Sequence, residues 1–282
     1  MANRKSSAML TRTITGAVLL AVLAVTLILG GWYFVALAFV ATTIAIYEEL
    51  NALTAGGHKP VKWTSYVALA LALPAVKLFS SSVVIIPILT VLTFCICLQV
   101  MRREAPVLDD IIYSVVPMLT LVLPCMCLAG ITLADTMPHL NKMLMVLLFA
   151  VAVGGDTFAY FVGSALRGPK LCPNISPNKT ISGSVGGLLG SVACAILVGR
   201  LFSIGAAQPY PPLWGDIIVG LLGGIAAQVG DLFASMVKRH CKVKDFGHIF
   251  PGHGGMLDRL DSIFFTCIIV YNYQVVLHLL LG

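Results

Sequence analysis

The sequence predicts an all-α integral membrane protein with about nine transmembrane helices. Of its 282 residues, 59% are hydrophobic and only 11% are charged, whereas soluble domains carry about 25% charged residues. Too few polar side chains are present to cover a soluble globule of this length. Apolar segments of about 20 residues, the length that crosses a bilayer as a helix, recur along the whole chain, without the alternation typical of barrel strands.

The expected spans follow one another with short connections. The third is short, and the first two are almost fused at Gly30 and Gly31. Pairs of glycines four residues apart, Gly186–Gly190 and Gly220–Gly224, predict close packing between helices. The spans are expected at residues 14–31, 32–53, 63–79, 81–101, 108–133, 141–165, 184–205, 213–237 and 260–281.

The basic residues predict a cytoplasmic N-terminus. With nine spans, all 18 Lys and Arg residues except Lys77, Lys142 and Arg200 fall in segments on one side, as the positive-inside rule requires of the cytoplasmic side. The net charge of +6 therefore reflects topology, and no nucleic-acid partner is expected. The first apolar run is longer than a usual signal core and lacks a clear small-x-small cleavage site, so a retained first helix is expected.

The eight cysteines are expected to be reduced packing residues. Cys95 and Cys97, like Cys125 and Cys127, have C-x-C spacing inside apolar segments. Zinc sites favour wider C-x2-4-C pairs with further Cys or His in range. The cysteine pattern therefore does not indicate a metal site.

Polar motifs are concentrated in the second half of the chain. Residues 1–150 are expected to form a helical scaffold, and residues 151–282 a catalytic region with cytoplasmic loops at 166–183 and 238–259. The scaffold contains one tandem acid pair, Glu48-Glu49, near the end of the second span. Acids inside a membrane segment usually serve function, although this pair lies close enough to the expected interface to reach it.

Two carboxylates on different spans predict a divalent-cation site. Asp231 lies seven residues before Lys238, about 10 Å along a helix. A lone carboxylate there costs about 2.5–3.5 kcal/mol, so it requires a cation. Asp258 lies near the start of the last span, and one or two carboxylates with substrate phosphates and water suit Mg²⁺. The alternative is that Asp258 and Asp261 only cap a helix N-terminus, which does not account for Asp231.

The loops beside these acids are rich in donors suited to phosphate. A basic run can neutralise a triphosphate, and glycines allow the backbone to approach phosphate oxygens. The alternative for the basic run is contact with anionic lipids. The residues concerned are Lys238, Arg239, Lys242, Lys244, Gly252, Gly254 and Gly255, with Lys170, Ser176, Lys179, Thr180 and Ser182 in the earlier loop.

The run from Ser235 to Asp261, SMVKRHCKVKDFGHIFPGHGGMLDRLD, resembles the signature of the phosphatidate cytidylyltransferase (CDP-diacylglycerol synthase) family. The stretch from Gly155 to Thr180 is similar to a second conserved region of that family. Three departures are Ser164 in place of Arg, residues 166–169 in place of a Phe-Gly-Lys pattern, and Ser182 in place of Glu or Gln.

The resemblance implies transfer of CMP from CTP to phosphatidic acid, giving CDP-diacylglycerol and pyrophosphate in phospholipid biosynthesis. Mg²⁺ is the expected cofactor, alone or with a second cation, and Asp231 and Asp258 are its expected ligands. We assign Lys238, Arg239 and Lys244 to the CTP phosphates, and Ser176 and Lys179 to the lipid phosphate. The remaining candidate site residues are Asp156, Thr180, Ser235, Asp245, His253, Gly254, Gly255, Arg259 and Asp261.

The expected location is a bacterial inner membrane, with the site facing the cytoplasm and the bilayer as a partner; a homodimer is a family expectation. One alternative is a related CTP-dependent lipid enzyme, either a CDP-archaeol synthase or a polyprenol kinase. Another is an ion-coupled transporter using Asp156 and Asp231, although no internal repeat supports it.

Overall fold

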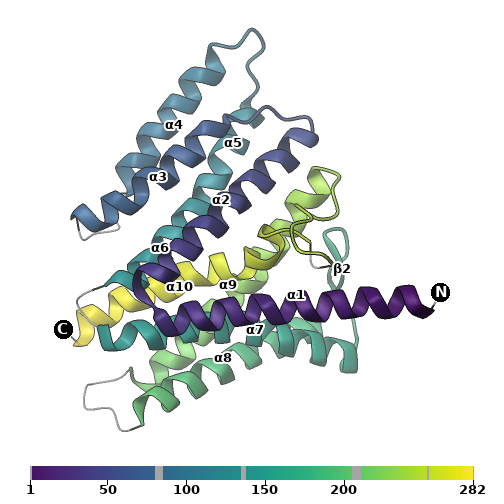
Figure 1. The fold of residues 1–282 in the computed structure, drawn as a ribbon, viewed down its shortest axis with the longest axis vertical. Coiled ribbons are helices and arrows are strands. Elements are labelled where there is room, and N and C mark those ends of the chain that lie inside the picture. Colours follow the sequence, from purple (N-terminus) through teal and green to yellow (C-terminus); the bar gives the residue numbers. More distant parts are fainter. Residues whose placement is uncertain (1, 80–84, 135–137, 205–210, 253, 282) are drawn as a thin grey trace. The chain divides into compact units, whose positions relative to one another are not determined.

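A computed structural model describes residues 2–79, 85–134, 138–204, 211–252 and 254–281. The helices are α1 (Ala2–Leu29), α2 (Gly31–Ala55), α3 (Lys62–Phe79), α4 (Ile85–Met101), α5 (Leu108–Pro117), η2 (Met118–Val122), α6 (Leu123–Leu133), α7 (Pro138–Leu166), α8 (Ile181–Ser203), α9 (Leu213–His240) and α10 (Leu257–Leu281). The prediction of an all-α protein is confirmed (Figure 1). The start of the expected span 81–101 lies outside the described residues.

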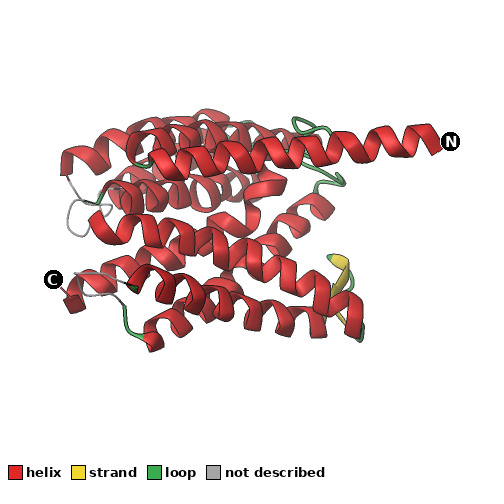
Figure 2. Cartoon of the chain, turned by 60° about the horizontal axis from the view of Figure 1, so that its bottom comes forward, coloured by secondary structure: helices red, strands yellow, loops and turns green. Residues whose placement is uncertain are grey.

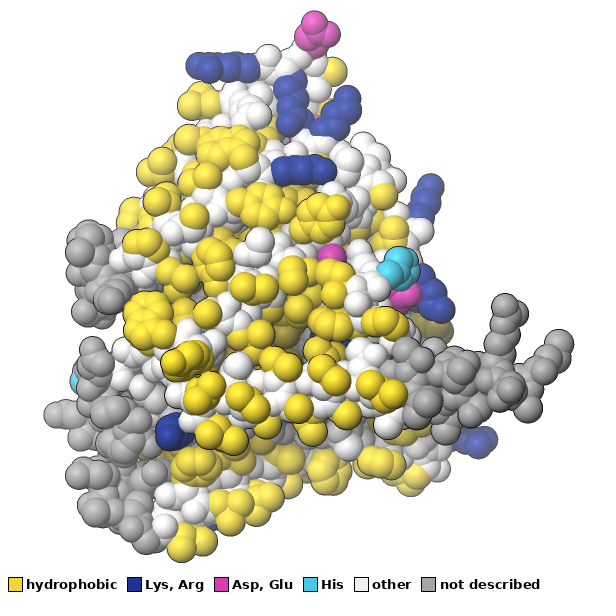
Figure 3. All heavy atoms as spheres, in the orientation of Figure 1, with side chains coloured by type: hydrophobic (Ala, Val, Ile, Leu, Met, Phe, Trp, Pro, Cys, Tyr) yellow, Lys and Arg dark blue, Asp and Glu magenta, His cyan; other side chains and the backbone are white. Residues whose placement is uncertain are grey.

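Six helical segments of the described chain are long and apolar enough to cross a membrane. The count of nine spans and the cytoplasmic N-terminus stay predictions. The face in Figure 3 is covered largely by hydrophobic side chains, and Lys and Arg gather around the α4–α5 loop at the top of the view. Large apolar side chains such as Leu20, Leu189 and Leu279 are exposed, as suits lipid-facing helices. The six segments are Gly31–Ala55, Leu108–Leu133, Leu140–Leu166, Ile181–Ser203, Leu213–His240 and Leu257–Leu279.

The chain divides into two compact units, Met1–Ala129 with Val237–Leu260, and Gly130–Met236 with Asp261–Gly282. Helices α9 and α10 each pass from one unit into the other. The first unit contains α1 to η2 and the start of α6, together with the polar loop after α9. The predicted functional division at residue 150 stays a prediction.

Two local breaks shape the helices of the first unit. Between α1 and α2 the backbone has φ 63° at Gly30 and 50° at Gly31, a left-handed conformation that favours glycine. The chain therefore turns where the sequence shows two nearly fused spans. Pro117, which lacks an N–H donor, ends α5, and the π-helical turn η2 follows it. Such turns accommodate an interrupted hydrogen-bond ladder within a continuous span.

Glycines allow the helices of the second unit to pack closely. A Cβ at Gly190 would lie 2.5 Å from Phe158 on α7, and a Cβ at Gly186 would lie 2.5 Å from Val162. On α9, Gly220 faces Val192 and Gly224 faces Ser191 in the same way. The close packing predicted from both glycine pairs is confirmed, and Figure 1 shows α7 and α8 side by side.

The loop after α7 contains a small hairpin that the sequence did not predict. Strands β1 (Lys170–Cys172) and β2 (Ser176–Thr180) pair antiparallel, with Lys170 opposite Thr180. The hairpin is the strand element in Figure 2. Thr180 then caps α8, since its hydroxyl accepts a hydrogen bond from the N–H of Gly183 at 3.1 Å. The hairpin thus fixes Lys179 directly before a helix N-terminus.

The eight cysteines are all free thiols, as expected. Cys241, just after α9, is buried, and a Cβ at Gly56 would lie 3.3 Å from its sulfur. Burial and the nearby Glu49 carboxylate raise the pKa of the Cys241 thiol. A thiol that resists ionisation is a weak nucleophile, so Cys241 is a packing residue.

Candidate functional site

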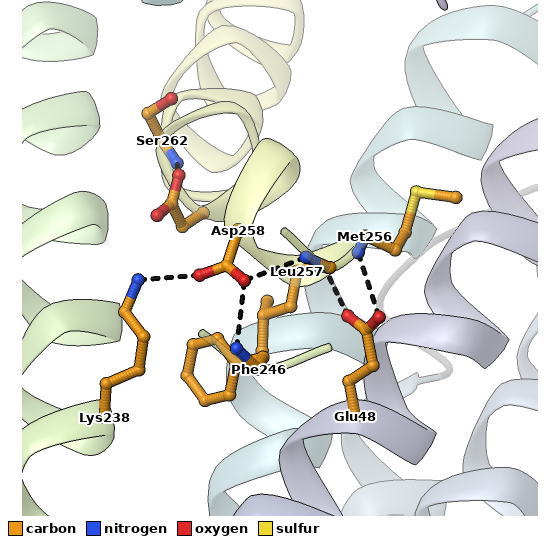
Figure 4. Close-up of polar contacts among 9 residues, drawn as sticks. Glu48, Lys238, Phe246, Met256, Leu257, Asp258 and Ser262 are labelled. Carbon is orange, nitrogen blue, oxygen red and sulfur yellow. Dashed lines mark hydrogen bonds and ion pairs between the residues drawn. The ribbon is translucent and has the colours of Figure 1, made fainter. Parts of the chain in front are cut away.

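A polar cluster surrounds the first turn of α10 in the first unit. We call it the α10 cluster; it consists of Glu48, Lys238, Asp258 and the backbone N–H groups of Phe246, Gly255, Met256 and Leu257. Figure 4 shows these groups drawn together from α2, the end of α9, the loop after it and α10. The N–H groups of Gly255, Met256 and Leu257 meet two carboxylates at the start of α10, where unpaired N–H groups and the helix dipole favour negative charge. The N–H of Phe246 reaches the same carboxylate of Asp258 from the loop.

Asp258 is the centre of this cluster. Its Oδ1 accepts a bond from the Nζ of Lys238 at 2.7 Å, and the two side chains are only 4% and 16% exposed. Its Oδ2 accepts bonds from the N–H of Phe246 at 2.9 Å and of Gly255 at 3.0 Å. The Lys238 ammonium also lies 5.4 Å from the centre of the Phe246 ring. The carboxylate is therefore held by a cation and by the polar loop together.

Glu48 reaches the same helix start from α2. It is 3% exposed. Its Oε1 accepts from the N–H of Met256 at 3.1 Å and its Oε2 from the N–H of Leu257 at 2.9 Å. A carboxylate on N–H groups that the helix itself cannot pair is a strong, charge-assisted cap.

Two glycines of the polar loop provide the space for Glu48. A Cβ at Gly255 would lie 2.5 Å from its Oε2, and a Cβ at Gly247 would contact its Oε1 at an impossible distance. Gly255 is one of the glycines predicted to let a phosphate approach the backbone, and in the structure it also makes room for this carboxylate. Gly254 has φ 81°, and its carbonyl accepts the N–H of Phe250 at 3.0 Å, which closes the loop before α10.

The remaining candidates of the loop lie around this cluster. Arg239, Lys244 and Arg259 are exposed, and Asp245 is half-buried. An exposed cation can reorient toward an incoming anion, so these side chains are suited to phosphate contacts. His253 lies outside the described residues.

A second polar cluster lies within the second unit. We call it the Lys179 cluster; it consists of Asp156, Lys179, Asp231 and Ser262. The Nζ of Lys179 lies 2.5 Å from Oδ2 of Asp231. Asp156 on α7 interacts electrostatically with both of these groups and hydrogen-bonds with Ser262. The cation that Asp231 requires inside its span is therefore supplied by Lys179 from the hairpin.

Other candidates of the second unit have local partners. Asp261 accepts the N–H of the next residue, Ser262, at 2.8 Å. Ser182 donates to the carbonyl of Arg167, and its oxygen lies 3.2 Å from the hydroxyl oxygen of Thr180, so one departure from the family pattern closes the hairpin loop. Ser164 donates to the carbonyl of Phe161 at 3.0 Å within α7. Ser176 and Ser235 are half-buried.

The donor chemistry of both clusters suits Mg²⁺. Among the described residues, no group of three or more His, Cys, Asp and Glu side chains is close enough to hold a metal ion. A Mg²⁺ site needs only one or two carboxylates when substrate phosphates supply the other oxygens. Asp231 and Asp258 each present a carboxylate already paired with an ammonium group, which shows that each position favours a cation.

Glu48 is a functional candidate that the local sequence pattern does not single out. The only signal was its place in a tandem acid pair within an apolar segment, and that signal does not distinguish Glu48 from Glu49. In the structure both are buried, yet Glu48 holds the start of α10 whereas Oε2 of Glu49 has no hydrogen-bond partner. The residues that Glu48 contacts, Met256 and Leu257, lie 208 and 209 positions away in the sequence, beyond the reach of any local pattern.

Comparison with known proteins identifies the family of the chain. The Cytidylyltransferase family matches residues 10–277. Proteins named phosphatidate cytidylyltransferase are similar to the chain: one from Brucella abortus is 45% identical over 46% of each chain, and one from Bacillus subtilis is 43% identical over 41% of each. A Rickettsia conorii protein of the same name is 37% identical over 58% of this chain and 73% of its own length. The alignments with the first two span less than half the length of those relatives. Since the family match extends over nearly all 282 residues, the chain belongs to the cytidylyltransferase family.

Proposed function

We propose that this protein is a phosphatidate cytidylyltransferase, which transfers CMP from CTP to phosphatidic acid and releases pyrophosphate. The family and the names of its relatives support this activity. The observation that carries the proposal is the α10 cluster, in which Lys238 at the end of α9 pairs with Asp258 in the first turn of α10, and both helices are apolar enough to cross a membrane. A lipid substrate and a water-soluble nucleotide can both reach such a position.

The reaction needs no general base. The phosphate monoester of phosphatidic acid has a second pKa near 6, so it is largely dianionic at neutral pH. One of its oxygens attacks the α-phosphorus of CTP, a new P–O bond forms, and the bond to the β-phosphate oxygen breaks as pyrophosphate leaves. The obstacle is the meeting of two anions, so catalysis consists of positioning and charge stabilisation.

The cations of the two clusters are proposed to supply that stabilisation. Lys238, with Arg239 and Lys244, neutralises the CTP phosphates and the leaving pyrophosphate. Lys179 and Ser176 bind the phosphate of the lipid. The carboxylates of Asp231 and Asp258 already hold the ammonium groups of Lys179 and Lys238 in place, which lowers the ordering cost of binding.

Mg²⁺ is the proposed cofactor, with Asp231 and Asp258 as its ligands. Bound there, it would neutralise phosphate oxygens as a Lewis acid. Removal of divalent cations is expected to abolish turnover, and restoring Mg²⁺ is expected to recover it.

We further propose nine spans with a cytoplasmic N-terminus, in the inner membrane of a bacterium. The distribution of Lys and Arg supports this topology, and it places the loop after α9 on the side where CTP is present. A homodimer is proposed from the family resemblance alone.

The test is an acceptor comparison with the purified full-length protein, CTP and Mg²⁺. Diacyl phosphatidate is expected to give CDP-diacylglycerol, and free polyprenol is expected to give no product. Product from polyprenol alone would instead favour a CTP-dependent kinase, and product only from an ether-linked archaeal phosphatidate would favour a CDP-archaeol synthase.

A further inference from the structure

Glu48 belongs to a helix that carries none of the residues assigned to the reaction. It lies on α2 and is 3% exposed. Both of its carboxylate oxygens are used by the N–H groups of Met256 and Leu257. Among the described residues, the structure gives it no Lys or Arg ion-pair partner, so the start of α10 is its principal electrostatic partner.

The contacts continue from this helix start to the reactive cluster. Asp258 directly follows Leu257, and its Oδ2 accepts the N–H of Gly255. Its Oδ1 binds Lys238. The position of the Asp258 carboxylate therefore depends on the first turn of α10, and Glu48 holds that turn through the N–H groups of Met256 and Leu257 (Figure 4).

The loop is shaped to accept this carboxylate. Gly247 and Gly255 are the two loop residues whose Cβ atoms would collide with Glu48. Neither has a left-handed φ, so their backbone conformations do not require glycine. The close approach of Glu48 accounts for glycine at both positions.

We propose that Glu48 is a positioning residue for cytidylyl transfer, which fixes the first turn of α10 and thereby orients Asp258 and Lys238. The expected loss of activity rests on the proposed function, whereas the expected loosening of the start of α10 does not. Glu48 acts through the helix start and takes no part in the bond changes.

The direct test is hydrogen exchange measured by mass spectrometry on the full-length protein in detergent, for Glu48→Gln, Glu48→Asp and the matched control Glu49→Gln. Glutamine places an NH₂ donor against one of the two N–H groups. Exchange across residues 255–258 is expected to accelerate about 10- to 100-fold in Glu48→Gln, the factor expected for one lost charge-assisted hydrogen bond. Glu48→Asp retains the charge and should lose less protection, and Glu49→Gln should leave this segment unchanged.

Kinetics provide a second readout. Because Glu48 is proposed to place Asp258 and Lys238, Glu48→Gln is expected to lower kcat/KM for CTP about 100-fold, as for a displaced catalytic group. Unchanged exchange at 255–258, or equal acceleration throughout α2 and α10, would overturn the proposal, since the second pattern indicates general destabilisation. If the wild-type protein makes no lipid product from CTP, the proposed function fails, and the exchange data still decide whether Glu48 holds the helix start.

A suppressor experiment tests the same contact from the other side. Gly247→Ala is expected to accelerate exchange at 255–258 in the wild-type background, because the new Cβ meets the Glu48 carboxylate. In the Glu48→Ala background that obstacle is absent, so adding Gly247→Ala should change exchange by less than about twofold. Equal effects of Gly247→Ala in the two backgrounds would show that Glu48 is not what the glycine accommodates.

Discussion

The buried pair between Lys238 and Asp258 gives the sharpest energetic prediction. Asp258→Asn removes the charge that balances Lys238, whose side chain is only 16% exposed. Breaking a buried pair by removing one partner costs about 3–5 kcal/mol. The expected loss of unfolding free energy in Asp258→Asn is about 3 kcal/mol, because the Lys238 ammonium is not fully buried and keeps its contact with the Phe246 ring.

The reverse change is expected to cost less. In Lys238→Met, Asp258 keeps the N–H groups of Phe246 and Gly255, so the loss is about 1.5–3 kcal/mol for one charge-assisted bond. In the double variant, the asparagine oxygen can accept the same N–H groups, and the Lys238 ammonium that would need a counter-charge is absent. The double variant should therefore be more stable than the sum of the single losses predicts, by about 1.5–3 kcal/mol.

Equilibrium unfolding of the four proteins, by titration of a mild detergent with a denaturing one, measures this coupling. Single changes whose losses add within about 0.5 kcal/mol would refute the reasoning, because independent sites behave in that way. All three variants are expected to lack turnover, so stability rather than activity is the informative readout.

Three further predictions follow from the second unit and from the cofactor. Lys179→Met is expected to reduce turnover at least about 100-fold while Lys179→Arg, which retains a cation for Asp231, recovers part of it; equal loss in both variants in a CTP assay would contradict this account. Gly190→Leu is expected to destabilise the protein by about 1–3 kcal/mol through collision with Phe158, measured by thermal unfolding against the exposed control Leu189→Phe; equal melting temperatures would contradict the packing. Chelation of divalent cations is expected to abolish turnover without lowering the melting temperature by more than a few degrees, and full activity in excess chelator would exclude a divalent cofactor.

The helices and most of the polar candidates could be predicted from the sequence because their signals are local. Apolar runs predict helical spans, and six helical segments of the described chain are long and apolar enough to cross a membrane. The glycine pairs at 186–190 and 220–224 predict close packing, which the neighbouring Phe158 and Ser191 confirm. A carboxylate inside an apolar span predicts a cationic partner, and Asp231 is paired with Lys179.

The partners of these groups could not be predicted in the same way. Nothing in the sequence shows that Lys179 rather than a closer lysine pairs with Asp231, because the pairing depends on a hairpin of eleven residues, 170–180, that has no alternating apolar pattern. The role of Glu48 depends on contacts more than two hundred residues away. Glu48 and Glu49 are the same residue type, and only their contacts in the folded chain distinguish them.

The most direct test of the central claim is to follow two labels of CTP into lipid. The full-length protein is incubated with phosphatidate, Mg²⁺ and CTP carrying a radioactive phosphorus at either the α or the γ position. Cytidylyl transfer predicts that the α label enters the organic phase as CDP-diacylglycerol, and that the γ label remains in water as pyrophosphate. Entry of the γ label into lipid, or failure of the α label to enter it, would contradict the account.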